Sequence, residues 1–167
     1  MKDRIFSGWV MPLLLGIGLV QSGLANNISV TNVSLVRFNA AAQTLNVAFD
    51  VAWENSWRGR DNWDAAWVFI KFKAPGSNRW EHAQLSTNSG NHTPSLSSVI
   101  SAVPDGKGVF VYRAGDYTGH VNYTQIKLQW DFGSNGYAFV KGDRIDVAVH
   151  AVEMVYIPQG AFYLGSG

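Results

Sequence analysis

The 167-residue chain contains no cysteine. Without thiols it has no disulfides, thiolate-bound metals, cysteine nucleophiles, iron–sulfur clusters or lipid-modified N-terminal cysteine. Charged residues are also scarce, at 15% of the chain, and they nearly cancel, with 13 basic and 12 acidic side chains. Because a chain without a basic surplus does not attract phosphate backbones or anionic lipids, nucleic-acid binding and peripheral membrane binding are not expected.

The N-terminal segment has the layout of a secretory signal. A charged start is followed by an uncharged stretch, residues 5–20, and then by small residues at Gly23 and Ala25. The stretch is shorter than the ~20 apolar residues that cross a bilayer. We therefore expect residues 1–25 to be a signal peptide and the mature protein to be secreted or periplasmic, with no stable membrane insertion after cleavage. A cysteine-free exported domain favours a bacterial source, because small secreted eukaryotic domains usually carry disulfides.

The remaining chain has the period-two pattern of β-strands. The clearest example is residues 44–53, in which Leu45, Val47, Phe49, Val51 and Trp53 alternate with polar or small residues. Further strands are expected at 28–38, 67–73, 79–85, 99–103, 108–113, 123–132 and 145–151, with turn residues between them. No helix is expected after the signal. The pattern predicts an all-β domain over residues 26–153, an antiparallel β-sandwich of immunoglobulin-like or jelly-roll topology.

One predicted strand differs from the others. Its first four residues, 67–70, are apolar at odd and even positions alike. Such a run is typical of a central strand that is covered on both faces.

Four of the seven tryptophans fall within residues 53–67. This segment supports two interpretations. In the first it forms an aromatic platform for sugar rings or cations, and its predicted ligand-binding residues are Trp57, Trp63, Glu54, Arg58, Asp61 and Asp64. In the second Trp53 and Trp67 cap the core, while the other two indoles anchor the loop. We favour packing, because aromatic side chains are more often buried than used as ligand platforms.

Motifs for catalysis are missing. Asp50, Glu54, Asp61 and Asp64 lack the spacing of a calcium loop or of a glycosidase carboxylate pair. The histidines lie in separate predicted elements, and no Gly-x-Ser-x-Gly turn occurs. We therefore predict that the protein is not an enzyme and has no cofactor or metal.

The C-terminal residues 153–167 resemble the opening segment of the formylglycine-generating, sulfatase-modifying-factor family, Met-Val-x-Ile-Pro-x-Gly-x-Phe-x-Met-Gly-Ser. The matching residues are Met154, Val155, Ile157, Pro158, Gly160, Phe162, Gly165 and Ser166, with Leu164 in the place of the methionine. Residues 53–58 and 62–71 are also similar to segments of exported bacterial proteins that carry a β-rich region ahead of such a domain.

The resemblance implies that residues 154–167 are either the truncated start of a sulfatase-modifying-factor-like domain or an edge strand of the sandwich. The oxidase activity of that family depends on a downstream cysteine pair, and this sequence has no cysteine. The first hypothesis is therefore a non-catalytic, exported interaction or accessory module that precedes such a domain. The alternative is a carbohydrate-binding module that uses residues 53–67. A protein or a carbohydrate is the expected partner.

Overall fold

The computed structural model describes residues 26–155, and these form a β-sandwich whose only helical element is one short 3₁₀ turn. The elements are β1 (Ser29–Asn39), β2 (Thr44–Arg58), β3 (Asp64–Lys73), β4 (Glu81–His82), η1 (Ser89–Asn91), β5 (Ser98–Ala102), β6 (Val109–Arg113), β7 (Tyr117–Asp131) and β8 (Asp146–Val155). Within this range no helix is long and apolar enough to cross a bilayer. The predicted all-β fold and antiparallel sandwich are confirmed.

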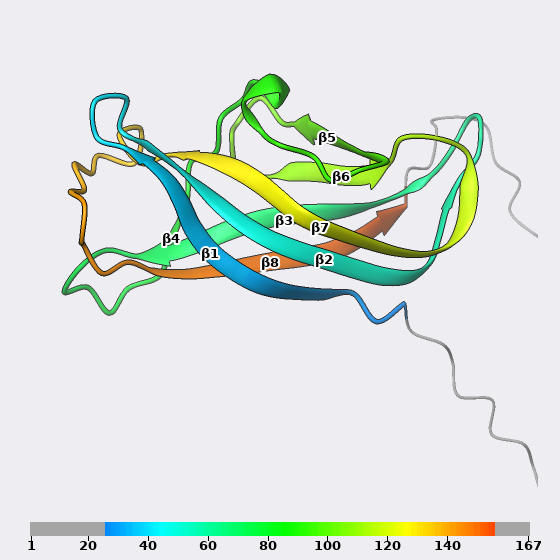
Figure 1. Cartoon of the computed structure of the whole chain (residues 1–167), viewed down its shortest axis with the longest axis horizontal. Helices are drawn as coiled ribbons and strands as arrows, with labels where there is room; N and C mark the ends of the chain where they lie inside the picture. The colour runs from blue at the N-terminus through cyan, green and yellow to red at the C-terminus, as the bar shows by residue number, and fades with distance from the viewer. Residues whose placement is uncertain (1–25, 156–167) are drawn as a thin grey trace, which may run out of the picture.

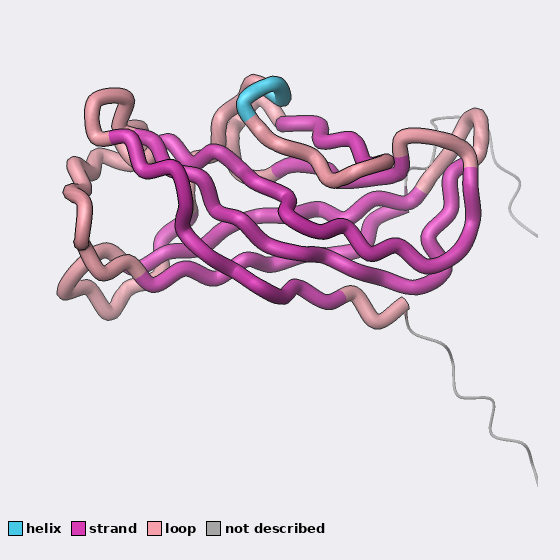
Figure 2. The backbone as a smooth tube through the Cα atoms, viewed as in Figure 1, coloured by secondary structure: helices cyan, strands magenta, loops and turns pink. Residues whose placement is uncertain are grey.

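The strands form two antiparallel sheets that face each other (Figure 1). The first sheet has the order β1-β2-β7. In the second, β3 is central: β8 pairs with it along one edge, β6 and then β4 pair with it along the other, and β5 adds to β6. Long strands run through both layers and the loops gather at the two ends (Figure 2).

The core lies between the sheets and follows from the alternation seen in the sequence. The predicted inward set of β2 is buried, with Val47, Phe49 and Trp53 fully inaccessible. Across the layer, Phe72 of β3 packs on Trp130 of β7 with ring centroids 4.4 Å apart. Burying such a side chain contributes about 1.5–3 kcal/mol or more, so the aromatic core stabilises a domain that has no disulfide.

Several strand boundaries differ from the predicted ones: β2 continues to Arg58, β8 continues to Val155, and β3 begins at Asp64. The return strand predicted at residues 79–85 is only Glu81–His82, because the chain then crosses to the other sheet, where Leu85 bridges to Trp130. The strand predicted at 123–132 begins earlier, because β7 already starts at Tyr117.

The predictions for the two ends of the chain fall largely outside residues 26–155. The expected signal peptide, residues 1–25, lies outside the described range. Of residues 154–167, Met154 and Val155 are the last two residues of β8, and the rest lie outside the described range.

Candidate functional site

The four tryptophans of residues 53–67 do not form one row. Trp53 is fully buried in the core. Trp63 and Trp67 are half-buried and lie on the outer side of the second sheet, since the intervening Asp64 points inward. Arg58 points to the same side as Trp63, because its guanidinium lies over the Trp63 ring. Successive side chains of a strand point to opposite sides, so the preceding residue, Trp57, points away from Trp63. The single platform predicted from all four indoles is therefore divided between the core and two surfaces.

Asp64 is the polar centre of this region. It is fully buried, and one carboxylate oxygen accepts a hydrogen bond from the Trp53 indole at 2.5 Å. The other oxygen accepts from the Ser56 hydroxyl and from the backbone N–H of Trp57, both at 3.0 Å. A carboxylate satisfied by three internal donors is a structural anchor. This placement does not fit the ligand-contact role predicted for Asp64.

Arg113 extends the same network to the surface. Its Nε donates to Ser56 Oγ at 3.0 Å, and its Nη2 donates to the carbonyl oxygen of Gly119 at 2.7 Å. Nearby, Tyr123 packs edge-on against Trp53, and burial raises the pKa of its phenol. The Tyr123 hydroxyl is the one buried side-chain polar atom of residues 26–155 without a hydrogen-bond partner. The network joins β2, β3 and β7 at one end of the sandwich.

The outer side of the second sheet carries a cluster that we call the aromatic face: Trp63, Trp67, Phe69, Phe110 and Tyr112. The strand register places its β3 and β6 members side by side, with Trp67 opposite Phe110. On the other side of β3, Val152 lies opposite Trp67 and Met154 opposite Ala65. Among residues 26–155 the strand orders include no further layer on this side of the sheet. Of residues 67–70, Val68 and Ile70 are buried on the inner face, whereas Trp67 and Phe69 are only partly covered on the outer face.

The rings of the aromatic face are held in place by close packing. Trp67 and Phe110 have centroids 4.8 Å apart. The Trp67 indole lies directly over Gly108, where an added Cβ would come within 2.5 Å of the ring. A glycine is thus required beneath this indole.

One end of the aromatic face is hollowed. A pocket of about 360 Å³ lies among Trp63, Ala65, Ser101, Phe110, Tyr112, Met154 and Val155. The Arg58 guanidinium carbon lies 5.0 Å from the Trp63 centroid and 5.3 Å from that of Tyr112, a cation–π arrangement. The Ser101 and Tyr112 hydroxyls form a hydrogen bond with each other at 2.9 Å. The pocket is therefore mainly apolar and aromatic. The last two residues of β8, Met154 and Val155, form part of its wall.

The other end of this sheet is polar and contains two histidines. Phe69 stacks on His150 with centroids 5.0 Å apart and meets His82 edge-on at 5.7 Å. Burial lowers the pKa of His82, although a hydrogen bond to the Ile70 carbonyl opposes this. Lys73 lies over the exposed Trp80 ring, and its Nζ lies 3.9 Å from an Asp146 carboxylate oxygen. The same side of the sheet thus passes from apolar to polar along β3.

The remaining predicted ligand residues are scattered. Glu54 accepts a hydrogen bond from the Asn27 amide at 3.2 Å. Asp61 is exposed and lies 4.0 Å from Arg60. Arg58 donates to the carbonyl oxygen of Arg113 and is the one predicted polar residue that meets the aromatic face. Phe110, Tyr112 and Arg113 were not predicted as site residues. Residues 109–112 are apolar at odd and even positions alike, and this pattern could have revealed Phe110 and Tyr112, which are half-buried on the outer face.

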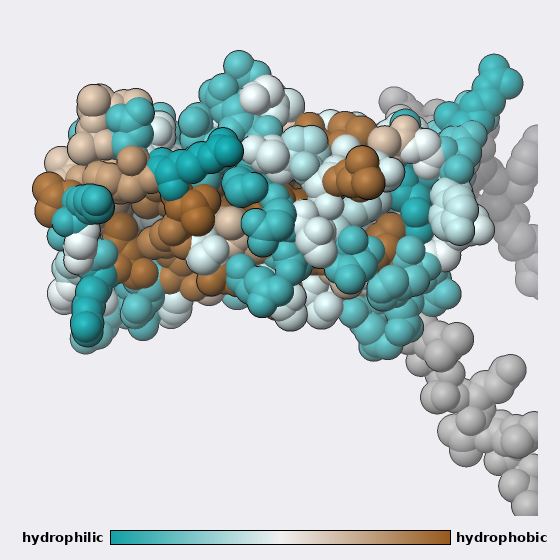
Figure 3. Space-filling view, viewed as in Figure 1, coloured by the Kyte–Doolittle hydropathy of each residue, from teal (hydrophilic) through white to brown (hydrophobic). Residues whose placement is uncertain are grey.

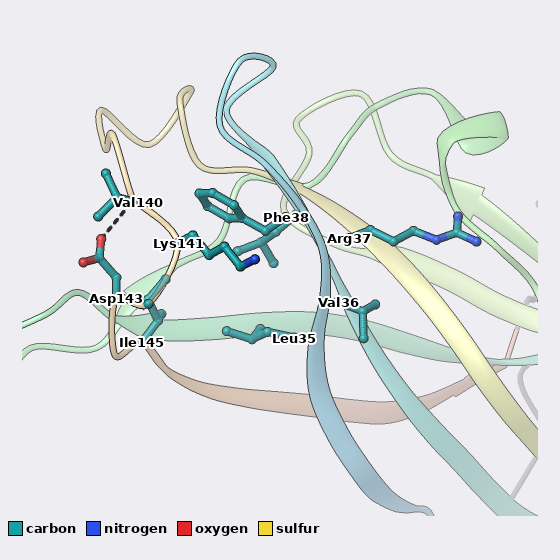
Figure 4. Close-up of a pocket in the computed structure, with 10 residues that line it drawn as sticks. Leu35, Val36, Arg37, Phe38, Val140, Lys141, Asp143 and Ile145 are labelled. Atoms are coloured by element: carbon teal, nitrogen blue, oxygen red, sulfur yellow. Dashed lines mark hydrogen bonds between the residues drawn. The ribbon is translucent and has the colours of Figure 1, made fainter.

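A second hollow lies on the open flank of the sandwich, between β1 and the loop that precedes β8. It encloses about 230 Å³. Leu35 and Ile145 point into it, whereas Arg37 points away, and the Val140 N–H donates to the Asp143 carboxylate at its rim (Figure 4). Its lining is mainly apolar, and the loop adds the charged side chains of Lys141 and Asp143.

No cluster of three or more histidine, aspartate or glutamate side chains with metal-binding geometry occurs within residues 26–155. No family model, curated protein or solved structure matches the chain. The site must therefore be interpreted from its own chemistry, and the resemblance of residues 153–167 to the sulfatase-modifying-factor family stays a prediction.

Proposed function

We propose that this chain is a non-catalytic, exported accessory module that works by docking, with the aromatic face as its docking surface. The observation that carries the proposal is a group of packed aromatic rings on the outer side of a sheet that no described layer covers. The five rings are half-buried, so each still presents part of its surface outward. Contiguous apolar surface that reaches solvent often marks an interaction site. Aromatic residues are also enriched in the centres of protein interfaces.

The proposed occupant is the sulfatase-modifying-factor-like domain whose opening segment residues 154–167 resemble. Met154 and Val155 are part of the pocket wall, so the chain that follows β8 starts next to Trp63 and Tyr112. A domain attached directly after β8 would have a high effective concentration at the aromatic face, since a short connection would keep it close. The module would then position that domain rather than take part in its chemistry.

Calorimetry on the longer gene product, read past Gly167, tests this proposal. Docked domains unfold together, so we expect one coupled transition. Tyr112→Lys should divide it into two transitions, because the charge would be buried at the interface. Asn122→Lys, on the exposed outer side of the first sheet, is the matched control and should leave one transition.

Two independent transitions in the unsubstituted product would overturn the proposal, as would a reading frame that encodes no such domain. Urea melts of the 167-residue chain show whether Tyr112→Lys itself unfolds the module. A lower midpoint with a complete folded baseline is expected, because the half-buried Tyr112 loses its hydrogen bond to Ser101 and its contact with Arg58 but does not belong to the core.

A carbohydrate-binding module is the second candidate, and one observation favours it. Trp63 and Trp67 share an outer surface with Tyr112, and indole faces stack on sugar rings. Native electrophoresis in gels that contain neutral or acidic polysaccharides tests this candidate. Retardation that is lost in both Trp63→Ala and Trp67→Ala would support it, whereas unchanged migration in every polysaccharide would exclude it.

A further inference from the structure

The two strands that border the open flank have different edges. β1 is irregular: its pairing with β2 shifts register between Thr31 and Ser34 and again between Val36 and Asn39. Asn32 and Arg37 have positive φ values of 55° and 52°. Bulges and left-handed residues twist an edge and hinder the addition of another strand. β1 is thus a protected edge.

β8 has none of these protections. All ten of its residues pair with β3 without a register shift. Within residues 26–155 its backbone forms hydrogen bonds with β3 alone, so its other edge is unpaired. The strand contains no proline, glycine or lysine, and Val152, Met154 and Val155 are 46–50% exposed. A long, regular and apolar edge of this kind is a template for pairing with another strand.

The flank beside this edge is also apolar. Ile145, Val147 and Val149 are only partly buried against the core. The surface between β1 and the first half of β8 is correspondingly hydrophobic (Figure 3). A strand added to β8 would cover part of this surface as well as satisfy the backbone groups.

We propose that the occupant of the β8 edge is β8 of a second copy of this chain, paired antiparallel about a two-fold axis near His150. An antiparallel pair of identical strands is self-complementary, as a closed two-fold dimer requires. In the register that keeps the outer faces of the two sheets on the same side, Asp146 of one copy lies opposite Met154 of the other, and Val147 lies opposite Glu153. No acidic side chain therefore lies opposite another acidic side chain. The dimer would join two five-stranded sheets and bring their two aromatic faces together. This inference does not depend on the occupant of the aromatic face.

Sedimentation of the full 167-residue chain across a concentration series tests the dimer. We expect dimerisation at protein concentrations up to about 100 μM. Lysines on the edge strands of natural sheets hinder pairing with another strand, and Val152→Lys introduces one on β8. The substitution should raise the dissociation constant of the dimer more than about tenfold. Val33→Lys, at a 40% exposed valine of the protected β1 edge, is the matched control and should leave the dimer unchanged.

Hydrogen exchange of β8 gives a second measurement on the unsubstituted protein. The dimer predicts protection of residues 146–155 that increases with protein concentration. Protection that is independent of concentration, in a monomer, would show that another part of the same chain covers the edge and would overturn the proposal. A monomer at every concentration, or equal weakening by Val152→Lys and Val33→Lys, would also overturn it.

Discussion

The outer faces of the two sheets differ sharply in chemistry. On the first sheet, Asn46, Ala48 and Asp50 of β2 lie beside Lys127 and Gln129 of β7, a small and polar surface in which Asn46 and Ala48 are themselves buried. On the second sheet the corresponding surface is the aromatic face, whose rings are half-buried. Because the inner faces already supply the core, these outer rings are not required to close the sandwich. This difference in side-chain chemistry is the basis of the docking role proposed for the second sheet.

The largest expected effect is on the free energy of unfolding, and it should differ between the core residue Trp53 and the outer-face residue Trp67. Trp53→Ala should reduce the free energy of unfolding by roughly 3–5 kcal/mol, because a fully buried indole leaves a cavity. Trp67→Ala should cost only roughly 1–2 kcal/mol, because this ring is half-buried on the outer face. Urea melts measure both values. Equal losses would mean that the Trp67 ring belongs to the core.

A smaller loss is expected from the buried carboxylate that anchors Trp53. Asp64→Asn keeps the shape of the side chain but turns an amide N–H₂ toward a donor, either the Trp53 indole or the Ser56 and Trp57 groups. We expect a loss of about 1.5–3 kcal/mol in urea melts. Asp61→Asn, at an exposed carboxylate, is the control and should have almost no effect. An equally small effect at Asp64 would contradict the assigned anchor role.

Gly108→Ala probes the packing of the outer face directly. The new methyl group would lie within 2.8 Å of the Val68 carbonyl oxygen as well as against the Trp67 ring, so the backbone itself must shift. We expect a loss of about 1–3 kcal/mol. Gly115→Ala, where nothing lies within 4 Å of the added atom, should be tolerated. If both variants melt alike, the Trp67 indole does not rest on Gly108.

The smallest expected effect is a pH dependence that arises on the side of the first sheet. His92 is buried: its Nδ1 accepts from the Gln129 N–H at 3.1 Å and its Nε2 donates to the Ser86 carbonyl at 2.9 Å. Burial lowers the pKa of His92 in the folded state. The unfolded chain therefore binds the proton more readily, and stability is complete above the ordinary histidine pKa of about 6.5 and falls as the pH drops below it.

Urea melts between about pH 7.5 and pH 5 measure this slope. His92→Gln should flatten it, although a smaller contribution from His82, whose pKa is also lowered, should remain. His120→Gln, at an exposed histidine, should leave the slope as it is. A slope that His92→Gln does not change would assign the proton uptake to another group.

The sequence predicted the strands well because period-two alternation reports directly on a half-buried strand. β2 illustrates this, since every predicted inward residue from Leu45 to Trp53 is buried. Alternation fails where both parities are apolar. The apolar run at Trp67 and Phe69 suggested that β3 is covered on both faces. In the described part of the chain, residues 26–155, no further strand layer lies over the outer face.

The site was harder to predict because its members come from distant parts of the chain. Trp63 and Tyr112 are brought together by the pairing of β3 with β6, and the sequence alone did not order the strands. The high density of tryptophan in residues 53–67 was also a misleading sign of a single aromatic site. Trp53 and Trp57 are close to Trp63 in sequence, yet the strand alternation and the buried Asp64 send them to the core and to the opposite surface.

The central claim is the proposal that the aromatic face is a docking surface for a sulfatase-modifying-factor-like domain attached after β8. Hydroxyl-radical footprinting of side chains tests it most directly, on the 167-residue chain and on the longer gene product in parallel. We predict that the half-buried Trp63, Phe110 and Tyr112 are oxidised less in the longer product than in the shorter chain, while the exposed Trp80 reacts equally in both. Equal oxidation of all four residues in the two proteins would contradict the account.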